Sequence, residues 1–300
     1  LGIIYVETER ENEGVKLLEV SLNQDEKQFW AYNAHGVGLL NLKEYKLAAL
    51  SFNRAIGVNP SYVDAYFNLG KTQRELGEIS GAIISYSKCI ELDKNYANAF
   101  NNLGTIFLEN LKDYDKSLEN FQQFNKLVPN STLGQNNLGT ALYKLERYDE
   151  AIKCYDRTIH LKPDDIQAHL NRGIALGKLK RYDEAVKCYD QIILLELDNE
   201  EAHLNRGTAL QKLKRYNDAI KSYKEVIKSN YANDRAYFNL GVIYSKLKLY
   251  DKAQKFYEKA LQSKTDPKEE IFSKDNYEGQ IRKYRNENEL DPYNAKTHLR

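Results

Sequence analysis

The residues of this chain whose type and spacing could support chemistry are six asparagines, separated from one another by 34 or 35 residues. Each carboxamide offers N–H donors and an oxygen acceptor, so a row of them could pair with the backbone of an extended peptide whatever its side chains. The asparagines are Asn68, Asn102, Asn137, Asn171, Asn205 and Asn239. Apolar residues that precede four of them are candidate anchors for apolar side chains: Phe67, Leu170, Leu204 and Phe238.

A second set of candidate binding residues is basic and recurs with the same spacing. Its members are Lys178, Arg181, Lys212 and Arg215. Such a basic ridge could attract acidic partners or phosphate groups. A solvated edge that keeps the chain soluble explains the same charges, and no exposed aromatic residues that could stack on bases are interleaved with them. We therefore do not expect nucleic acid to be the partner.

The histidines and cysteines do not form a recognisable catalytic or metal site. His169 and His203 lie 34 residues apart, and we expect both to pack inside the fold. The cysteines Cys89, Cys154 and Cys188 are expected to be buried, reduced thiols. The sequence also lacks a glycine-rich phosphate loop and closely spaced Cys or His pairs. It thus predicts no enzymatic activity, no cofactor and no metal.

Composition excludes several classes of protein. Of the 300 residues, 42% are hydrophobic and 29% are charged, with only 5 prolines, which fits neither a disordered chain nor a membrane protein. Lys and Arg number 44 against 43 Asp and Glu, so net charge predicts neither nucleic acid nor membrane binding. No apolar run reaches the roughly 18 residues that a spanning helix needs. Three cysteines do not make a disulfide scaffold, and we expect a cytoplasmic location.

The candidate residues are positioned by a repeat of 34 residues. Numbering each repeat so that its recurrent glycine is position 8 places the asparagines at position 6, a small residue at position 20 and an aromatic residue at position 24. The glycines are Gly36, Gly70, Gly104, Gly139, Gly173, Gly207 and Gly241. The apolar spacing predicts two helices in each repeat, over positions 2–14 and 18–30. One extra residue near Glu109 predicts a bulge or a longer turn there.

We divide the chain into a partial repeat over residues 1–28, seven tandem repeats over residues 29–267, and a degenerate repeat or C-terminal capping helix over residues 268–300. Both ends of the chain cut across repeats. We therefore expect parts of the natural protein to lie beyond them.

This pattern of glycine, small residue and aromatic resembles the tetratricopeptide repeat (TPR), a 34-residue helix-turn-helix unit, from Leu1 to about Thr265. The resemblance implies an all-α fold, a right-handed superhelical α-solenoid of helix-turn-helix repeats. It also implies that the position-6 asparagines line a concave groove, as in the repeat region of protein O-linked N-acetylglucosamine transferases. The two-carboxylate clamp of chaperone-binding members is not expected, since it needs Lys at position 5 and Asn at position 9, which these repeats lack.

The expected function is a non-enzymatic scaffold that binds a peptide or partner protein segment in the concave groove. Two alternatives remain open. The chain could be the substrate-selecting repeat region of a larger enzyme, such as a glycosyltransferase with its catalytic domain elsewhere, or an electrostatic adaptor that uses the basic ridge. The sequence predicts neither the identity of the partner nor the oligomeric state.

Overall fold

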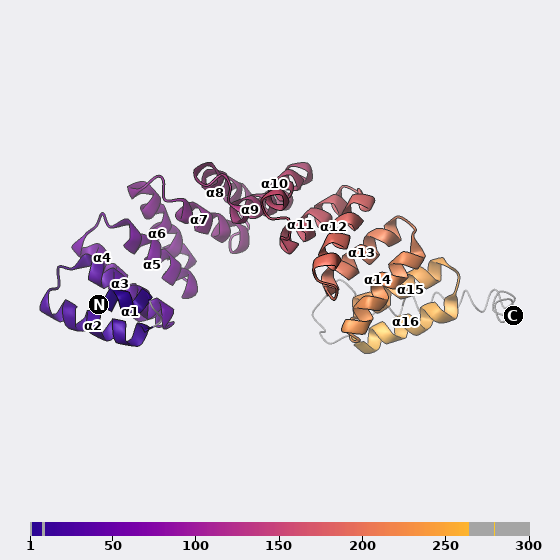
Figure 1. Ribbon diagram of the computed structural model, residues 1–300, viewed down its shortest axis with the longest axis horizontal. Helices are drawn as coiled ribbons and strands as arrows, with labels where there is room; N and C mark the ends of the chain where they lie inside the picture. Colours follow the sequence, from indigo (N-terminus) through magenta and orange to yellow (C-terminus); the bar gives the residue numbers. More distant parts are fainter. Residues whose placement is uncertain (1, 8–9, 264–278, 280–300) are drawn as a thin grey trace. The chain divides into compact units, whose positions relative to one another are not determined.

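The computed structural model describes residues 2–7, 10–263 and 279, and the regular secondary structure of these residues is helical throughout (Figure 1). The chain divides into two compact units, residues 1–154 and 155–300. The helices of the first unit are α1 (Gly2–Glu7), α2 (Glu11–Gln24), α3 (Phe29–Asn41), α4 (Tyr45–Val58), α5 (Val63–Glu75), α6 (Ile79–Leu92), α7 (Ala97–Glu109), α8 (Tyr114–Leu127) and α9 (Thr132–Lys144). The boundary falls within α10 (Tyr148–Leu161), and the second unit continues with α11 (Ile166–Lys178), α12 (Tyr182–Leu195), α13 (Glu200–Lys212), α14 (Tyr216–Ser229), α15 (Asp234–Lys246) and α16 (Tyr250–Ser263).

The helices form hairpins with the period that the sequence predicts. In the repeat that begins at Phe29, α3 spans positions 1–13 and α4 spans positions 17–30, within one position of the expected bounds. The all-α solenoid of helix-turn-helix units is thus confirmed. The division at the C-terminal end stays a prediction, because residues 268–300 lie outside the described part of the chain apart from Gly279.

In six hairpins an aromatic ring lies on the position-8 glycine, at Gly36, Gly70, Gly104, Gly173, Gly207 and Gly241. In α11 and α12, a Cβ atom added to Gly173 would lie 2.7 Å from Cε1 of Tyr189. The same contact recurs between Gly207 and Tyr223, where the Cβ would lie 2.6 Å from the ring. A side chain at the glycine would therefore hold the two helix axes apart. The rings themselves are among the most completely buried side chains of the protein.

From α3 onward, the turn inside each hairpin ends the first helix with a residue in the left-handed region. Between α5 and α6 that residue is Gly77, with φ of +77°, and the N–H of Glu78 donates to the carbonyl of Gln73 at 2.8 Å. This six-residue closure satisfies a carbonyl at the helix end. In the other turns a non-glycine residue takes this left-handed conformation, which costs backbone strain that glycine avoids. These residues are Lys43, Lys112, Glu146, Lys180, Lys214 and Lys248.

The turn between α7 and α8 is longer by one residue than the others. Four residues, 110–113, connect these helices, whereas three residues connect α5 to α6. Lys112 takes the left-handed conformation with φ of +54°, and the N–H of Asp113 donates to the carbonyl of Phe107 at 2.9 Å. The longer turn predicted from the extra residue is confirmed.

Within the described part of the chain, no helix combines the length and the apolar character that crossing a bilayer requires.

Two glycines of α11 provide a matched test of the ring-on-glycine contact. A Cβ at Gly173 would collide with Tyr189, whereas a Cβ at Gly177 would have no atom within 4 Å. We expect Gly173→Ala to lower the free energy of unfolding by about 1–3 kcal/mol through overpacking. Gly177→Ala should raise it by up to about 1 kcal/mol, because alanine has the higher helix propensity. Urea denaturation followed by circular dichroism measures both, and equal stability of the two variants would contradict this account.

Candidate binding surfaces

The amides of neighbouring repeats in the first unit bond to one another. Asn68 donates from Nδ2 to Oδ1 of Asn33 in the preceding repeat, at 3.0 Å. Asn137 donates in the same way to Asn101, at 2.9 Å. Asn102 instead donates to the hydroxyl of the core residue Tyr86, at 3.1 Å. In two places of this unit, a position-6 amide therefore bonds to the position-5 amide of the preceding repeat.

The amides of the second unit keep more of their bonding capacity. Asn171 accepts a hydrogen bond from Gln167 at 2.9 Å. Among the described residues, Asn205 and Asn239 have no side-chain hydrogen bond. All six position-6 asparagines are half-buried, neither sealed in the core nor fully solvated. Each amide therefore retains donors and acceptors that a ligand could reach.

The four residues expected as apolar anchors fall into two groups. Phe67 is partly exposed, and its ring packs against Tyr96 with a centroid separation of 5.0 Å. Phe238 is also partly exposed, and its ring lies 5.5 Å from that of Tyr257. Leu170 and Leu204 are only 7% and 5% exposed. The expectation that these two leucines anchor a ligand is corrected, because they are already covered by the fold.

The residues of the basic ridge are exposed, but half of them have acidic partners. Arg181 donates from Nε to Glu184 at 2.7 Å, and Arg215 donates from Nη2 to Asp218 at 2.9 Å. The two carboxylates lie in the first turn of the helix that follows, so each pair is local. Lys178 and Lys212 are exposed at the C-terminal ends of α11 and α13. The charge of the ridge is thus partly compensated within each repeat.

The histidines His169 and His203 and the cysteines have structural and not catalytic environments. His169 and His203 are both 8% exposed, and their Nε2 atoms bond to the carbonyls of Pro163 and Leu197, at 2.9 and 2.8 Å. Their expected packing role is confirmed. All three cysteines are free. Burial raises the pKa of Cys89 to about 12 and that of Cys154 to about 11, so these thiols stay protonated near neutral pH and are poor nucleophiles.

A polar bridge between consecutive repeats was not predicted from the sequence. Arg172 of α11 donates from Nε to Oδ1 of Asp156 in the preceding helix α10, at 2.6 Å. The same guanidinium donates from Nη1 to Sγ of Cys188 in α12, at 2.9 Å. One side chain therefore ties together three consecutive helices.

The bridge recurs one repeat later with the same spacing. Arg206 donates to Asp190 at 2.5 Å and to Oγ of Ser222 at 2.7 Å. In both bridges the carboxylate, the arginine, and the serine or cysteine are separated by 16 residues. The side chains of Arg172 and Arg206 are each 24% exposed, so these bonds are partly shielded from water. This 16-residue spacing is the pattern by which the sequence could have revealed them.

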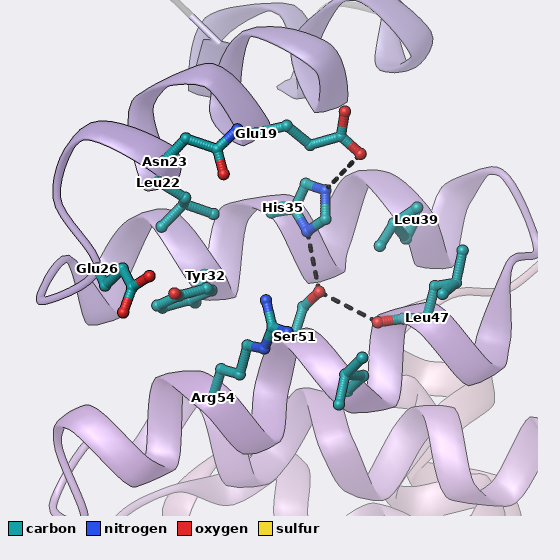
Figure 2. Close-up of a pocket in the computed structure, with 11 residues that line it drawn as sticks. Glu19, Leu22, Asn23, Glu26, Tyr32, His35, Leu39, Leu47, Ser51 and Arg54 are labelled. Carbon is teal, nitrogen blue, oxygen red and sulfur yellow. Dashed lines mark hydrogen bonds and ion pairs between the residues drawn. The ribbon is translucent and has the colours of Figure 1, made fainter.

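A third bridge of this kind, in the first unit, contains histidine in place of arginine. Nε2 of His35 lies 3.6 Å from Oε1 of Glu19, and Nδ1 lies 2.9 Å from Oγ of Ser51 (Figure 2). Ser51 donates its proton to the carbonyl of Leu47 at 3.1 Å. The direction of the bond between Nδ1 and Oγ depends on which ring nitrogen carries the single proton of the neutral imidazole. Nε2 has no hydrogen-bond partner.

This third bridge borders a pocket of about 380 Å³ between α2 and α4, above α3 (Figure 2). Burial lowers the pKa of His35, with Glu19 opposing that shift, so the imidazole is neutral near neutral pH. The order Glu19, His35, Ser51 is that of a serine hydrolase triad, but Ser51 is 5% exposed and directs its proton to backbone. No activated nucleophile faces the pocket. Its lining residues are Glu19, Leu22, Asn23, Glu26, Tyr32, His35, Leu39, Leu47, Leu50, Ser51 and Arg54.

Comparison with known families identifies the repeats. A TPR repeat model matches residues 71–110 and 139–180, and three tetratricopeptide repeat models match residues 99–131, 166–199 and 204–269. A search of curated protein sequences finds no match.

Several solved structures share the fold. The C-terminal part of a TPR repeat-containing protein from Cytophaga hutchinsonii has a TM-score of 0.69 at 17% identity, over 80% of this chain and 98% of that one. A tetratricopeptide repeat protein from Parabacteroides merdae has a TM-score of 0.61 at 16% identity, over 86% and 98%. YrrB, described as a TPR protein with an unusual peptide-binding site, has a TM-score of 0.56 at 22% identity, over 63% and 96%. At these identities the likeness shows the fold alone.

A double-mutant cycle tests whether the bridge couples neighbouring repeats. For Asp190 and Arg206, each replaced by Ala, we expect a coupling energy of about 1 kcal/mol, because Arg206 is mostly buried and holds a second bond. The matched control is the exposed pair Arg215 and Asp218 on a single helix, for which about 0.3 kcal/mol is expected. Urea unfolding measures both cycles. Equal coupling energies in the two cycles would show that the bridge contributes no more to stability than an ordinary surface ion pair.

Proposed function

Because the chain belongs to the tetratricopeptide repeat family, we propose that it is a scaffold that binds a peptide or protein segment along its position-6 asparagines. The observation that carries the proposal is the state of these amides in the folded chain. All six are half-buried, and each has at most one side-chain hydrogen bond within the described residues. Four of them are held by one hydrogen bond each, and all six keep donors or acceptors for an external ligand.

The chemistry of an amide row suits a backbone ligand. A carboxamide can donate to a peptide carbonyl and accept from a peptide N–H at the same time. Asn68 and Asn137 of the first unit are also bonded to the preceding repeat, which fixes their orientation before a ligand arrives. Orientation that is fixed in advance lowers the entropy lost on binding. Phe67 and Phe238 offer partly exposed rings beside the row and are the apolar contacts in this proposal.

Two further considerations support the scaffold function. YrrB, which has the same fold, is described as having a peptide-binding site, and we extend peptide binding to this chain by proposal. We also propose that the chain itself does not catalyse a reaction. Arrays built from this repeat are typically non-catalytic, the thiols of Cys89 and Cys154 are held protonated, and Ser51 is not activated.

The asparagine row is tested by replacing three of its consecutive members. Peptides are first selected on the chain from a random 12-residue library, and affinities are measured by calorimetry. Replacing Asn171, Asn205 and Asn239 together by Ala should weaken binding at least about tenfold, since each neutral hydrogen bond contributes about 0.5–1.5 kcal/mol.

The control variant replaces three exposed asparagines outside the row, Asn41, Asn53 and Asn217, and should bind as the parent does. Helicity should be unchanged in both variants. Unchanged affinity of the row variant would refute the role of the row. A steep loss of affinity with added salt would indicate that the peptide binds to the basic ridge and not to the asparagine row.

A further inference from the structure

The pocket between α2 and α4 lies where other repeats place a guanidinium. In the second unit, Arg172 and Arg206 fill the corresponding position and donate to a carboxylate on one side and to a serine or cysteine on the other. In the first unit the carboxylate is Glu19 and the hydroxyl is Ser51, but the residue between them is His35. The imidazole is shorter than the arginine side chain. A pocket of about 380 Å³ is bordered by these three residues.

The carboxylates of this pocket have no close cationic partner. Oε1 of Glu19 lies 3.6 Å from Nε2 of the neutral His35, farther than a normal hydrogen bond, so the charge of this carboxylate is not matched there. Glu26 lies beside Tyr32 at the other end of the pocket (Figure 2) and has no ion pair among the described residues. The cation in the lining, Arg54, has its guanidinium carbon 5.9 Å from the centroid of the Tyr32 ring. With two carboxylates and one guanidinium, the lining is negative.

The remaining walls suit the methylene stem of a long basic side chain. Leu22 and Leu39 are buried beneath the pocket, and Leu47 and Leu50 are about half exposed at its edge. Long basic side chains place their methylenes along apolar surface and their charge at its polar end. The volume is at the lower end of the range for ligand pockets, which fits one side chain better than a large cofactor.

We propose that this pocket binds an arginine side chain of a partner protein, with its guanidinium beside the imidazole of His35. The bound guanidinium donates to the Glu19 carboxylate and compensates the negative charge of the lining. A planar, always charged guanidinium is preferred to an ammonium because its fixed fork of donors matches a carboxylate. The partner is therefore a protein with an exposed arginine. The site recognises this side chain and not the peptide backbone.

This site is separate from the asparagine row and does not rest on it. The position-6 residue of α3 is Ala34, so the row has no member on this helix, and its first asparagine, Asn68, lies on α5. A variant that abolishes binding at one surface therefore leaves binding at the other surface measurable. The two proposals can fail independently.

The test is a titration of the full chain, observed by NMR through its backbone amides. The probe is a capped five-residue peptide, Gly-Ser-Arg-Ser-Gly, and the comparison peptide contains citrulline, a neutral isostere of arginine. We expect the arginine peptide to shift amides of α2, α3 and α4 with an affinity on the order of millimolar, and the citrulline peptide to shift none. Equal shifts with citrulline, or shifts confined to other helices, would overturn the proposal.

Two variants make the result specific. His35→Arg supplies the guanidinium from within, as in the second unit, so it should abolish binding while leaving thermal stability equal or higher. Glu19→Gln removes the charge with little change in shape and should weaken binding at least about tenfold. Unchanged binding in both variants would overturn the assignment. Free arginine amide that binds more tightly than the capped peptide would show a small-molecule site and overturn the assignment to a protein partner.

Discussion

The contact between the position-8 glycine and the position-24 ring is the constraint on which the other features depend. A ring that lies on a bare glycine brings the two helices of a hairpin closer than any side chain there would allow. That closeness fixes the rotation of each helix about its axis. In α11 it turns His169 and Leu170 into the packed interior and leaves Asn171 half-buried at the surface. Which residues can meet a partner is therefore decided inside the hairpin.

The fold could be predicted from the sequence because this contact needs particular residues at a fixed spacing. A glycine and an aromatic residue 16 positions apart recur in repeat after repeat, and this pattern is easily recognised in the sequence. The extra residue near Glu109 could be assigned to a turn, because an insertion within a helix would rotate all later residues out of their packing positions. Whether the apolar side chain at position 5 of a repeat is buried or exposed could not be predicted from the sequence. That position lies near the edge between the packed and open faces, and whether Leu170 or Phe67 is covered depends on the side chains that the adjoining helices bring against it.

The bridges at 16-residue spacing were missed for a different physical reason. Three interactions with one geometry use Arg or His, Asp or Glu, and Ser or Cys, so no single residue type recurs. Charged and hydroxyl residues are also common on solvated faces, where they carry no structural information. Only the docked helices show that a carboxylate of one hairpin and a hydroxyl of the next converge on the same side chain. The pocket beside His35 follows from that convergence and was equally hidden.

The two candidate surfaces complement one another in what they recognise. In the proposed scaffold, the amide row bonds to the backbone that all peptides share and supplies affinity with little choice of sequence. The proposed arginine pocket adds selectivity, because a neutral residue there leaves the charge of the Glu19 carboxylate without a partner. The two surfaces use different repeats, since the pocket borders α3, whose position-6 residue is Ala34 and not an asparagine. The bridge that Arg172 and Arg206 form in their own repeats holds an imidazole at His35, and the pocket borders this shorter side chain.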